Sequence, residues 1–184
     1  MTPAEGWNWT YNGERLAISL KTEDGHKQTF CTHFRMRDLL NPPLSGEPFC
    51  LADARLLTVF RESFSELGLD DKGCLDLGIN AVACERFVRP SIPVTRYFRR
   101  FEGRRLFESG SIVTVYTVSG RAGDCIVLES LDADDLVRLM LLNPVLILSE
   151  GKSVTLGRMI RVNPAAVCTF RAFSAKKSDE AKYA

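Results

Sequence analysis

Residues 70–105, DDKGCLDLGINAVACERFVRPSIPVTRYFRRFEGRR, connect the most apolar helical segment of this chain to its most basic segment. Asp70 and Asp71 can cap a helix, and apolar residues at helical spacing over residues 75–88 cover nearly every side of it. A helix that is apolar on all sides is typical of a buried helix. Small residues such as Gly78 would let a neighbouring element approach it closely. Pro90 ends the helix, because proline lacks an amide proton and disfavours helix in the residue before it.

A stiff extended spacer at residues 90–93 leads from this helix into a segment of arginines interleaved with aromatic residues. The arginines are Arg96, Arg99, Arg100, Arg104 and Arg105, and the rings between and after them are Tyr97, Phe98, Phe101 and Phe107. One interpretation is a solvated strand edge, where positive charge discourages pairing with other chains. The other is a docking surface for an acidic partner, since arginine and aromatic residues are enriched at binding hot spots.

Single-stranded nucleic acid is a third candidate for this segment, because rings and arginines on a small barrel hold single strands in that way. The formal net charge of the chain is only +1, however, and nucleic-acid-binding domains usually have a clear basic excess. Any electrostatic recognition must therefore come from local clustering of charge.

The chain before residue 70 predicts a small antiparallel sheet followed by a helix. Residues 7–11 alternate aromatic and polar side chains, Asn12-Gly13 is a hairpin signal, and residues 16–20 and 28–34 can form two further strands. Residues 36–40 predict a short helical turn. The apolar spacing of residues 51–67, with Asp53 in the first turn, predicts a helix that ends at Gly68.

The chain after residue 93 predicts many short strands and no long helix. Residues 112–118 and 125–128 read as a strand and its return strand, and Asn143-Pro144 separates two further apolar strands. Short strands with glycine turns suggest a small barrel or sandwich. The fold class expected is α+β: an N-terminal α/β domain over residues 1–90, a C-terminal twisted, barrel-like β domain over residues 91–173, and a charged disordered tail over residues 174–184.

No arrangement of residues in the sequence argues for an enzyme, a cofactor or a metal site. The chain has no phosphate-binding loop, dinucleotide-binding motif or nucleophile elbow. Its two histidines, His26 and His33, are expected at the surface, and its six cysteines are scattered without a paired motif. This pattern favours buried thiols in a reducing cytoplasm. We expect no signal peptide, because the first residues lack a basic segment followed by an apolar one, and the longest apolar runs are far too short to span a bilayer, so we expect no membrane partner.

Five segments, in order along most of the chain, resemble the Z-ring-associated protein C (ZapC) family. They are Trp7-x-Trp9-x-Tyr11, Phe49-Cys50-x-x-Asp53-Ala54, Asn80-Ala81 followed by Arg86, Arg89-Pro90-x-x-Pro93, and Leu156-Gly157-x-x-Ile160. The resemblance implies a cytoplasmic bacterial division factor, located at the division site, that is not an enzyme. Such proteins bind the tubulin-like GTPase FtsZ, promote lateral association of its protofilaments, stabilise the Z ring and lower FtsZ GTPase activity. Self-association is left open.

The resemblance also implies a basic surface near the domain junction. Arg89 matches it directly, whereas Val94 stands where a lysine is expected, and Arg96, Arg99 and Arg100 can compensate. The arginines expected on the partner-binding surface are Arg86, Arg89, Arg96, Arg99, Arg100, Arg104 and Arg105. The residues expected to form an apolar pocket or to act as anchors are Trp7, Trp9, Tyr11, Ile18, Tyr97, Phe98 and Phe101. For Trp7, Trp9 and Tyr11 the core interpretation is favoured over the pocket.

Overall fold

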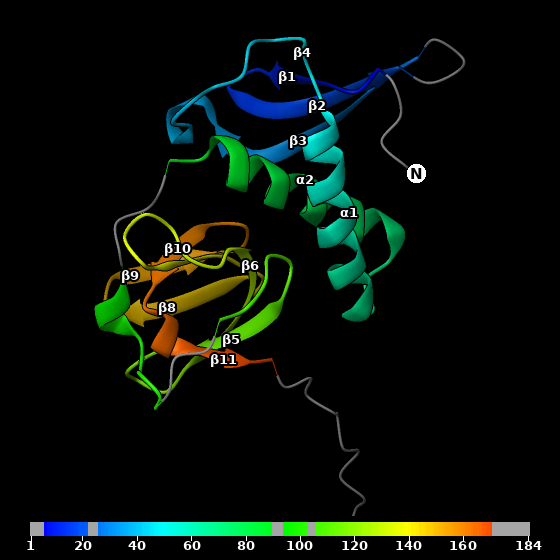
Figure 1. Cartoon of the computed structure of the whole chain (residues 1–184). Coiled ribbons are helices and arrows are strands. Elements are labelled where there is room, and N and C mark those ends of the chain that lie inside the picture. Colours follow the sequence, from blue (N-terminus) through cyan, green and yellow to red (C-terminus); the bar gives the residue numbers. More distant parts are fainter. Residues whose placement is uncertain (1–5, 22–25, 90–93, 103–105, 171–184) are drawn as a thin grey trace, which may run out of the picture.

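The computed structural model describes residues 6–21, 26–89, 94–102 and 106–170 (Figure 1). The predicted disordered tail, the spacer at residues 90–93, and Arg104 and Arg105 lie outside the described residues. Two helices and many antiparallel strands confirm the predicted α+β class. None of the helices in the described part of the chain is both long and apolar enough to cross a bilayer.

The N-terminal sheet is the predicted meander with one short strand added. β1 (Asn8–Asn12), β2 (Arg15–Lys21) and β3 (Lys27–Arg35) pair antiparallel, and β4 (Glu47–Pro48) pairs with the free edge of β1. The strand order is β3-β2-β1-β4. The pairing of Asn12 with Arg15 leaves a two-residue turn that begins at Gly13, as the Asn-Gly signal predicts. The predicted short turn is the helical turn η1 (Met36–Asp38).

The two helices form where their caps and apolar spacing predict them. In α1 (Leu51–Glu66) the Asp53 side chain accepts from the Cys50 backbone amide, and in α2 (Asp71–Phe87) the Asp70 side chain accepts from the Gly73 amide at 2.8 Å. Gly78 is needed for close packing of the two helices. A Cβ at this position would lie 2.7 Å from Leu57 Cδ1 of α1.

The C-terminal strands form an open sheet covered on one face by a hairpin, and no closed barrel is present in the described residues. The sheet has the order β10-β7-β6-β5-β11. Its strands are β5 (Ile112–Tyr116), β6 (Ala122–Glu129), β7 (Val137–Leu141), β10 (Met159–Val162) and β11 (Val167–Thr169). The hairpin consists of β8 (Val145–Ser149) and β9 (Lys152–Thr155). The strands on either side of Asn143-Pro144 are not paired with each other, because the chain there leaves the sheet for the second layer.

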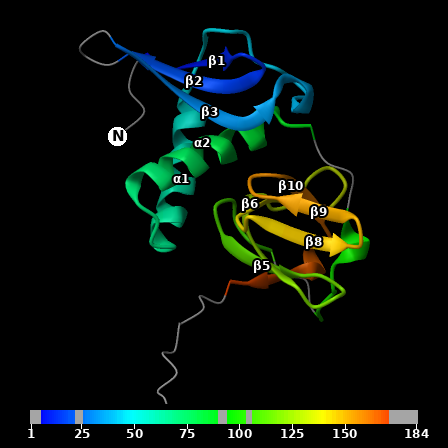
Figure 2. The same ribbon diagram turned by 180° about the vertical axis from the view of Figure 1, so that it is seen from behind.

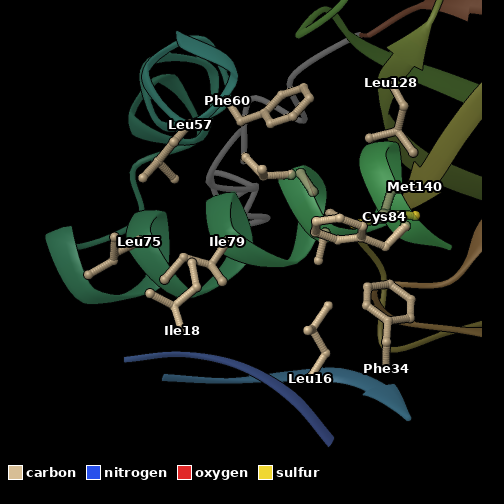
Figure 3. Close-up of a cluster of buried hydrophobic side chains, with 14 of the residues drawn as sticks. Leu16, Ile18, Phe34, Leu57, Phe60, Leu75, Ile79, Cys84, Leu128 and Met140 are labelled. Carbon is tan, nitrogen blue, oxygen red and sulfur yellow. The ribbon is translucent and has the colours of Figure 1, made fainter. Parts of the chain in front are cut away.

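Helix α2 lies between the two sheets, and this position explains its apolar character (Figure 2). Leu16 and Ile18 of β2 pack on one side of it, while Leu128 and Met140 of the C-terminal sheet lie on the other (Figure 3). A second apolar cluster fills the space between the opposite face of the C-terminal sheet and the β8–β9 hairpin, where Leu146 is buried. The larger core is therefore shared by segments before and after residue 90. The division into domains at residue 90 stays a prediction.

Candidate partner-binding surface

A buried carboxylate joins three segments of the N-terminal half. Asp53 of α1 has a relative exposure of 0%. It accepts hydrogen bonds from the Trp9 indole Nε1 at 3.1 Å and from the Cys50 backbone amide at 3.0 Å. The Arg86 guanidinium, from the last turn of α2, also donates to this carboxylate. Asp53 thus has a structural role beyond helix capping, because it connects β1, α1 and α2.

The same contacts hold the partly buried side chain of Arg86 against the fold. Its guanidinium also lies 3.7 Å from the Glu47 carboxylate and 4.9 Å from the centre of the Phe87 ring. Burial alone would lower the pKa of Arg86, but the hydrogen bond and charge of Asp53 outweigh it and raise the pKa. Arg86 is therefore less available to a partner than the exposed Arg89, Arg96, Arg99 and Arg100.

The aromatic residues of β1 pack into the core. The Trp9 ring meets Phe87 edge to face with the ring centres 5.0 Å apart, and Phe49 lies 5.5 Å from both Trp7 and Trp9. Ile18 is also fully buried. Tyr11 is partly buried and donates its hydroxyl to the Pro43 carbonyl at 2.9 Å. Trp7, Trp9 and Ile18 thus present no free surface to a partner.

The segment after the spacer is attached by backbone hydrogen bonds both to β10 and to the end of β5, which lie toward opposite sides of the C-terminal sheet. It contains the helical turn η2 (Thr95–Tyr97). The Val94 amide donates to Arg161, the Arg99 amide to Tyr116, and the Val118 amide to Tyr97, at 2.8 to 3.1 Å. Phe98 is buried in the C-terminal core, at an isolated bridge with Thr117. This attachment gives the exposed side chains of the segment a defined position.

Four of the predicted arginines are exposed: Arg89, Arg96, Arg99 and Arg100. None of the four forms an ion pair with an acid in the described ranges. The Arg99 guanidinium donates to the Val118 carbonyl, at 3.3 Å. Phe101 is 40% exposed, with its ring edge to face against Tyr116 at 5.9 Å. The cationic side chains and Phe101 thus face solvent, as a docking surface requires.

Two residues of this surface were not predicted from the sequence. Lys152, at the start of β9, places its ammonium 5.4 Å from the centre of the Tyr97 ring. Val118, in the turn after β5, is 60% exposed although it lies beside Tyr97 and Arg99. Both are far from residues 96–101 in the sequence, so no local pattern associates them with the arginines. We call Arg89, Arg96, Tyr97, Arg99, Arg100, Phe101, Val118 and Lys152 the basic surface.

Ion pairs fix this surface relative to the N-terminal half. Arg138 of β7 bonds both Glu129 at 2.9 Å and Glu85 of α2 at 2.6 Å. Burial raises the pKa of Glu85 in spite of the neighbouring Arg138 charge. Arg158, just before β10, lies 3.2 Å from Asp38 of η1. Ion pairs therefore connect the C-terminal strands to α2 and to η1 at two separate places.

Among the residues that the structure describes, neither the potential metal ligands nor the buried thiols suggest a second site. Among the described residues, no group of three or more His, Cys, Asp or Glu side chains is arranged to hold a metal ion. Cys84 and Cys125 are buried, and burial raises the pKa of both thiols far above its ordinary value. Such thiols are poor nucleophiles, because the thiolate is the reactive form.

Comparison with known proteins agrees with the resemblance noted in the sequence. A family model described as "Cell-division protein ZapC, N-terminal" matches residues 1–89. A "Cell division protein ZapC" of Musicola paradisiaca is 24% identical over 169 residues, which cover 91% of this chain and 89% of that protein. The protein of the same name in Aeromonas hydrophila is 27% identical over 128 residues, or 70% of each chain. The one in Aliivibrio salmonicida is 27% identical over 140 residues, or 76% of each.

These relatives share one name, and the similarity to the Musicola paradisiaca protein covers 91% of this chain, so it extends from the N-terminal half into the C-terminal strands. The first two of the five segments contribute to the Asp53 cluster, the third lies in α2, and the last lies in the turn before β10 and in β10 itself. The segment that begins at Arg89 extends outside the described residues. Residues 1–89 thus match the family model of the cell-division protein ZapC, and relatives of that name are similar to most of the chain.

Proposed function

We propose that this protein binds polymers of FtsZ through the basic surface, promotes lateral association of the protofilaments and stabilises the Z ring at the division site. The supporting observation is the group of four exposed arginines with no acidic partner among the described residues. Exposed arginines accompanied by the exposed apolar side chains of Phe101 and Val118 fit a partner surface that combines acidic groups with apolar contacts.

Lateral association of protofilaments depends on how many filaments one molecule or assembly of this protein can bind. A molecule that joins two filaments must contact both, either through two sites on one chain or by self-association. Each contact can be weak, because a filament presents many equivalent sites and avidity multiplies weak contacts.

Suppression of GTP hydrolysis needs no catalytic group on this chain. A ligand that binds polymer more tightly than monomer shifts the equilibrium toward polymer and slows the exchange of subunits. Slower exchange lowers the turnover of GTP. We accordingly assign no enzymatic activity and no cofactor to the protein.

Co-sedimentation with purified FtsZ and GTP, with phosphate release measured in parallel, tests the proposal. The protein should pellet with polymer, reduce phosphate release and pellet less as salt rises, since exposed charges are screened beyond about 8–10 Å. The double variant Arg99→Glu/Arg100→Glu should no longer pellet. Pelleting that is constant from low to high salt would exclude the basic surface as the binding site.

A charge-matched control is available on the helices. Arg55 of α1 and Lys72 of α2 are both exposed and lie outside the basic surface. The double variant Arg55→Glu/Lys72→Glu changes the net charge by the same amount and should pellet like the wild type. A gel shift with short oligonucleotides tests the alternative function, a single-stranded nucleic-acid-binding module. The open C-terminal sheet gives that alternative no additional support.

A further inference from the structure

Tyr97 lies between two cationic side chains that come from distant parts of the sequence. The Arg96 Nη2 lies 2.8 Å from the Tyr97 hydroxyl, and the Arg96 guanidinium is 4.9 Å from the ring centre. The Lys152 ammonium approaches the same ring from the β8–β9 hairpin, 5.4 Å from its centre. The turn that contains Tyr97 lies beside that hairpin in both views of the molecule (Figures 1 and 2).

The chemistry of the three groups determines the direction of their hydrogen bonds. Guanidinium and ammonium groups can only donate, so the Tyr97 oxygen accepts from Arg96. The phenol proton is then left to donate outward. Hydrogen bonding from Lys152, and then from Arg96, lowers the pKa of Tyr97, which makes its hydroxyl a stronger donor. The Tyr97 hydroxyl, the Arg96 guanidinium and the Lys152 ammonium are thus three hydrogen-bond donors that lie close together on the surface.

Backbone hydrogen bonds and a buried neighbour fix the position of Tyr97 in the unbound protein. The Val118 amide donates to the Tyr97 carbonyl at 2.8 Å, and the Tyr97 amide donates to Val94 at 3.0 Å. The next residue, Phe98, is buried in the core below. A side chain on a rigid backbone loses little entropy when a partner binds, which favours affinity.

We infer that Tyr97, Arg96 and Lys152 form a carboxylate-binding point that receives an aspartate or glutamate side chain of the filament. A carboxylate accepts several hydrogen bonds, and bonds from charged donors are the strongest kind in proteins. The exposed Val118 beside it provides apolar contact. This inference rests on the proposed function and assigns the chemistry of the partner group at that same surface.

The decisive variant is Tyr97→Phe, because it removes the hydroxyl without changing net charge. It keeps the ring that contacts both cations, so general electrostatic attraction is unaltered. We expect the Kd for GTP-assembled FtsZ to rise about tenfold, the loss of one hydrogen bond to a charged group. Lys152→Gln should raise the Kd as well, and should weaken its dependence on salt.

Tyr116→Phe is the matched control. Tyr116 is a neighbouring, partly exposed tyrosine whose ring packs against Phe101, and no hydrogen bond of its hydroxyl occurs within the described structure. It should bind like the wild type, and thermal melting should show all three variants folded. If the wild type pellets and Tyr97→Phe pellets equally well, or if both tyrosine variants weaken equally, the inference is overturned. A wild type that never pellets would overturn the proposed function instead.

Discussion

The guanidinium of Arg86 is hydrogen-bonded to the carboxylate of Asp53, and that carboxylate has no exposure to solvent. Removal of one member of such a pair leaves an uncompensated buried charge. We predict that Arg86→Ala lowers the free energy of unfolding by about 3 kcal/mol. Urea unfolding followed by tryptophan fluorescence measures the change, since Trp9 is part of the same cluster.

Arg89→Ala is the natural comparison. Arg89 is exposed just beyond the end of α2, so the variant should change the stability by no more than about 0.5 kcal/mol while it weakens co-sedimentation with FtsZ. The opposite pattern, with Arg86→Ala stable and defective in binding, would contradict the structural role of Arg86.

Gly157 is required by its conformation and by its contact with the N-terminal half. Its φ is +75°, and a Cβ at this position would lie 2.5 Å from the His33 Nδ1 of β3. We predict that Gly157→Ala destabilises the fold by about 3 kcal/mol, of which the left-handed backbone accounts for about 1–2 kcal/mol. Thermal or urea unfolding gives the value.

Gly151→Ala isolates the contribution of the contact. Gly151 has a φ of +69° but no atom within 4 Å of the added Cβ. It should therefore show the backbone cost alone, about 1–2 kcal/mol. Equal losses at the two positions would show that His33 moves aside freely.

His33 should make the stability depend on pH. Burial first, and then the charges of Arg15 and Arg158, lower the pKa of His33 from 6.5, although Asp76 opposes this shift. The unfolded chain therefore binds more protons than the folded chain between the lowered pKa and 6.5, so stability falls as the pH drops through that window. Above 6.5 both states are neutral at this residue and it has no effect.

His33→Gln should remove this contribution. We predict a smaller loss of stability between about pH 7 and pH 5 for the variant than for the wild type, measured by urea unfolding at a series of pH values. Parallel curves for the two proteins would show that His33 has the same pKa in the folded and unfolded chains.

The shared core predicts that the two halves unfold together. Leu128 and Met140 belong to the same buried cluster as the residues of α2, and Arg138 bonds to Glu85 across the junction. Both tryptophans lie in the first half, so their fluorescence should show the same urea midpoint as hydrogen exchange at β7. Two separate midpoints would instead support independent domains on either side of residue 90.

Local physics explains why most elements could be predicted from the sequence. Asp70 and the apolar spacing after it specify α2, Gly68 ends the preceding helix, and Asn12-Gly13 specifies the first hairpin. These signals act over a few residues. The elements can therefore be predicted without knowledge of the tertiary contacts that stabilise them further. The separation of β7 from β8 could not be read in this way, because strand pairing depends on distant partners.

The candidate surface was harder to predict, because exposure depends on what packs against each side chain. Arg86 and Arg89 are close in sequence and equally basic, yet one bonds a buried carboxylate while the other faces solvent. The helical repeat turns Arg86 toward β1 and α1, whereas Arg89 follows the end of α2. Spacing alone could not reveal that a buried carboxylate pairs with Arg86, whereas no acid of the described residues pairs with Arg89.

The sequence by itself determined the helices, most strands, the concentration of arginine and aromatic residues after the buried helix, and the resemblance to a cell-division family. Only the tertiary structure decided which of those cations are available, and that Lys152 joins them at Tyr97. The physical reason is that helix caps, turns and periodicity are short-range properties of the chain. Burial and charge pairing arise when segments that are distant along the chain are packed together.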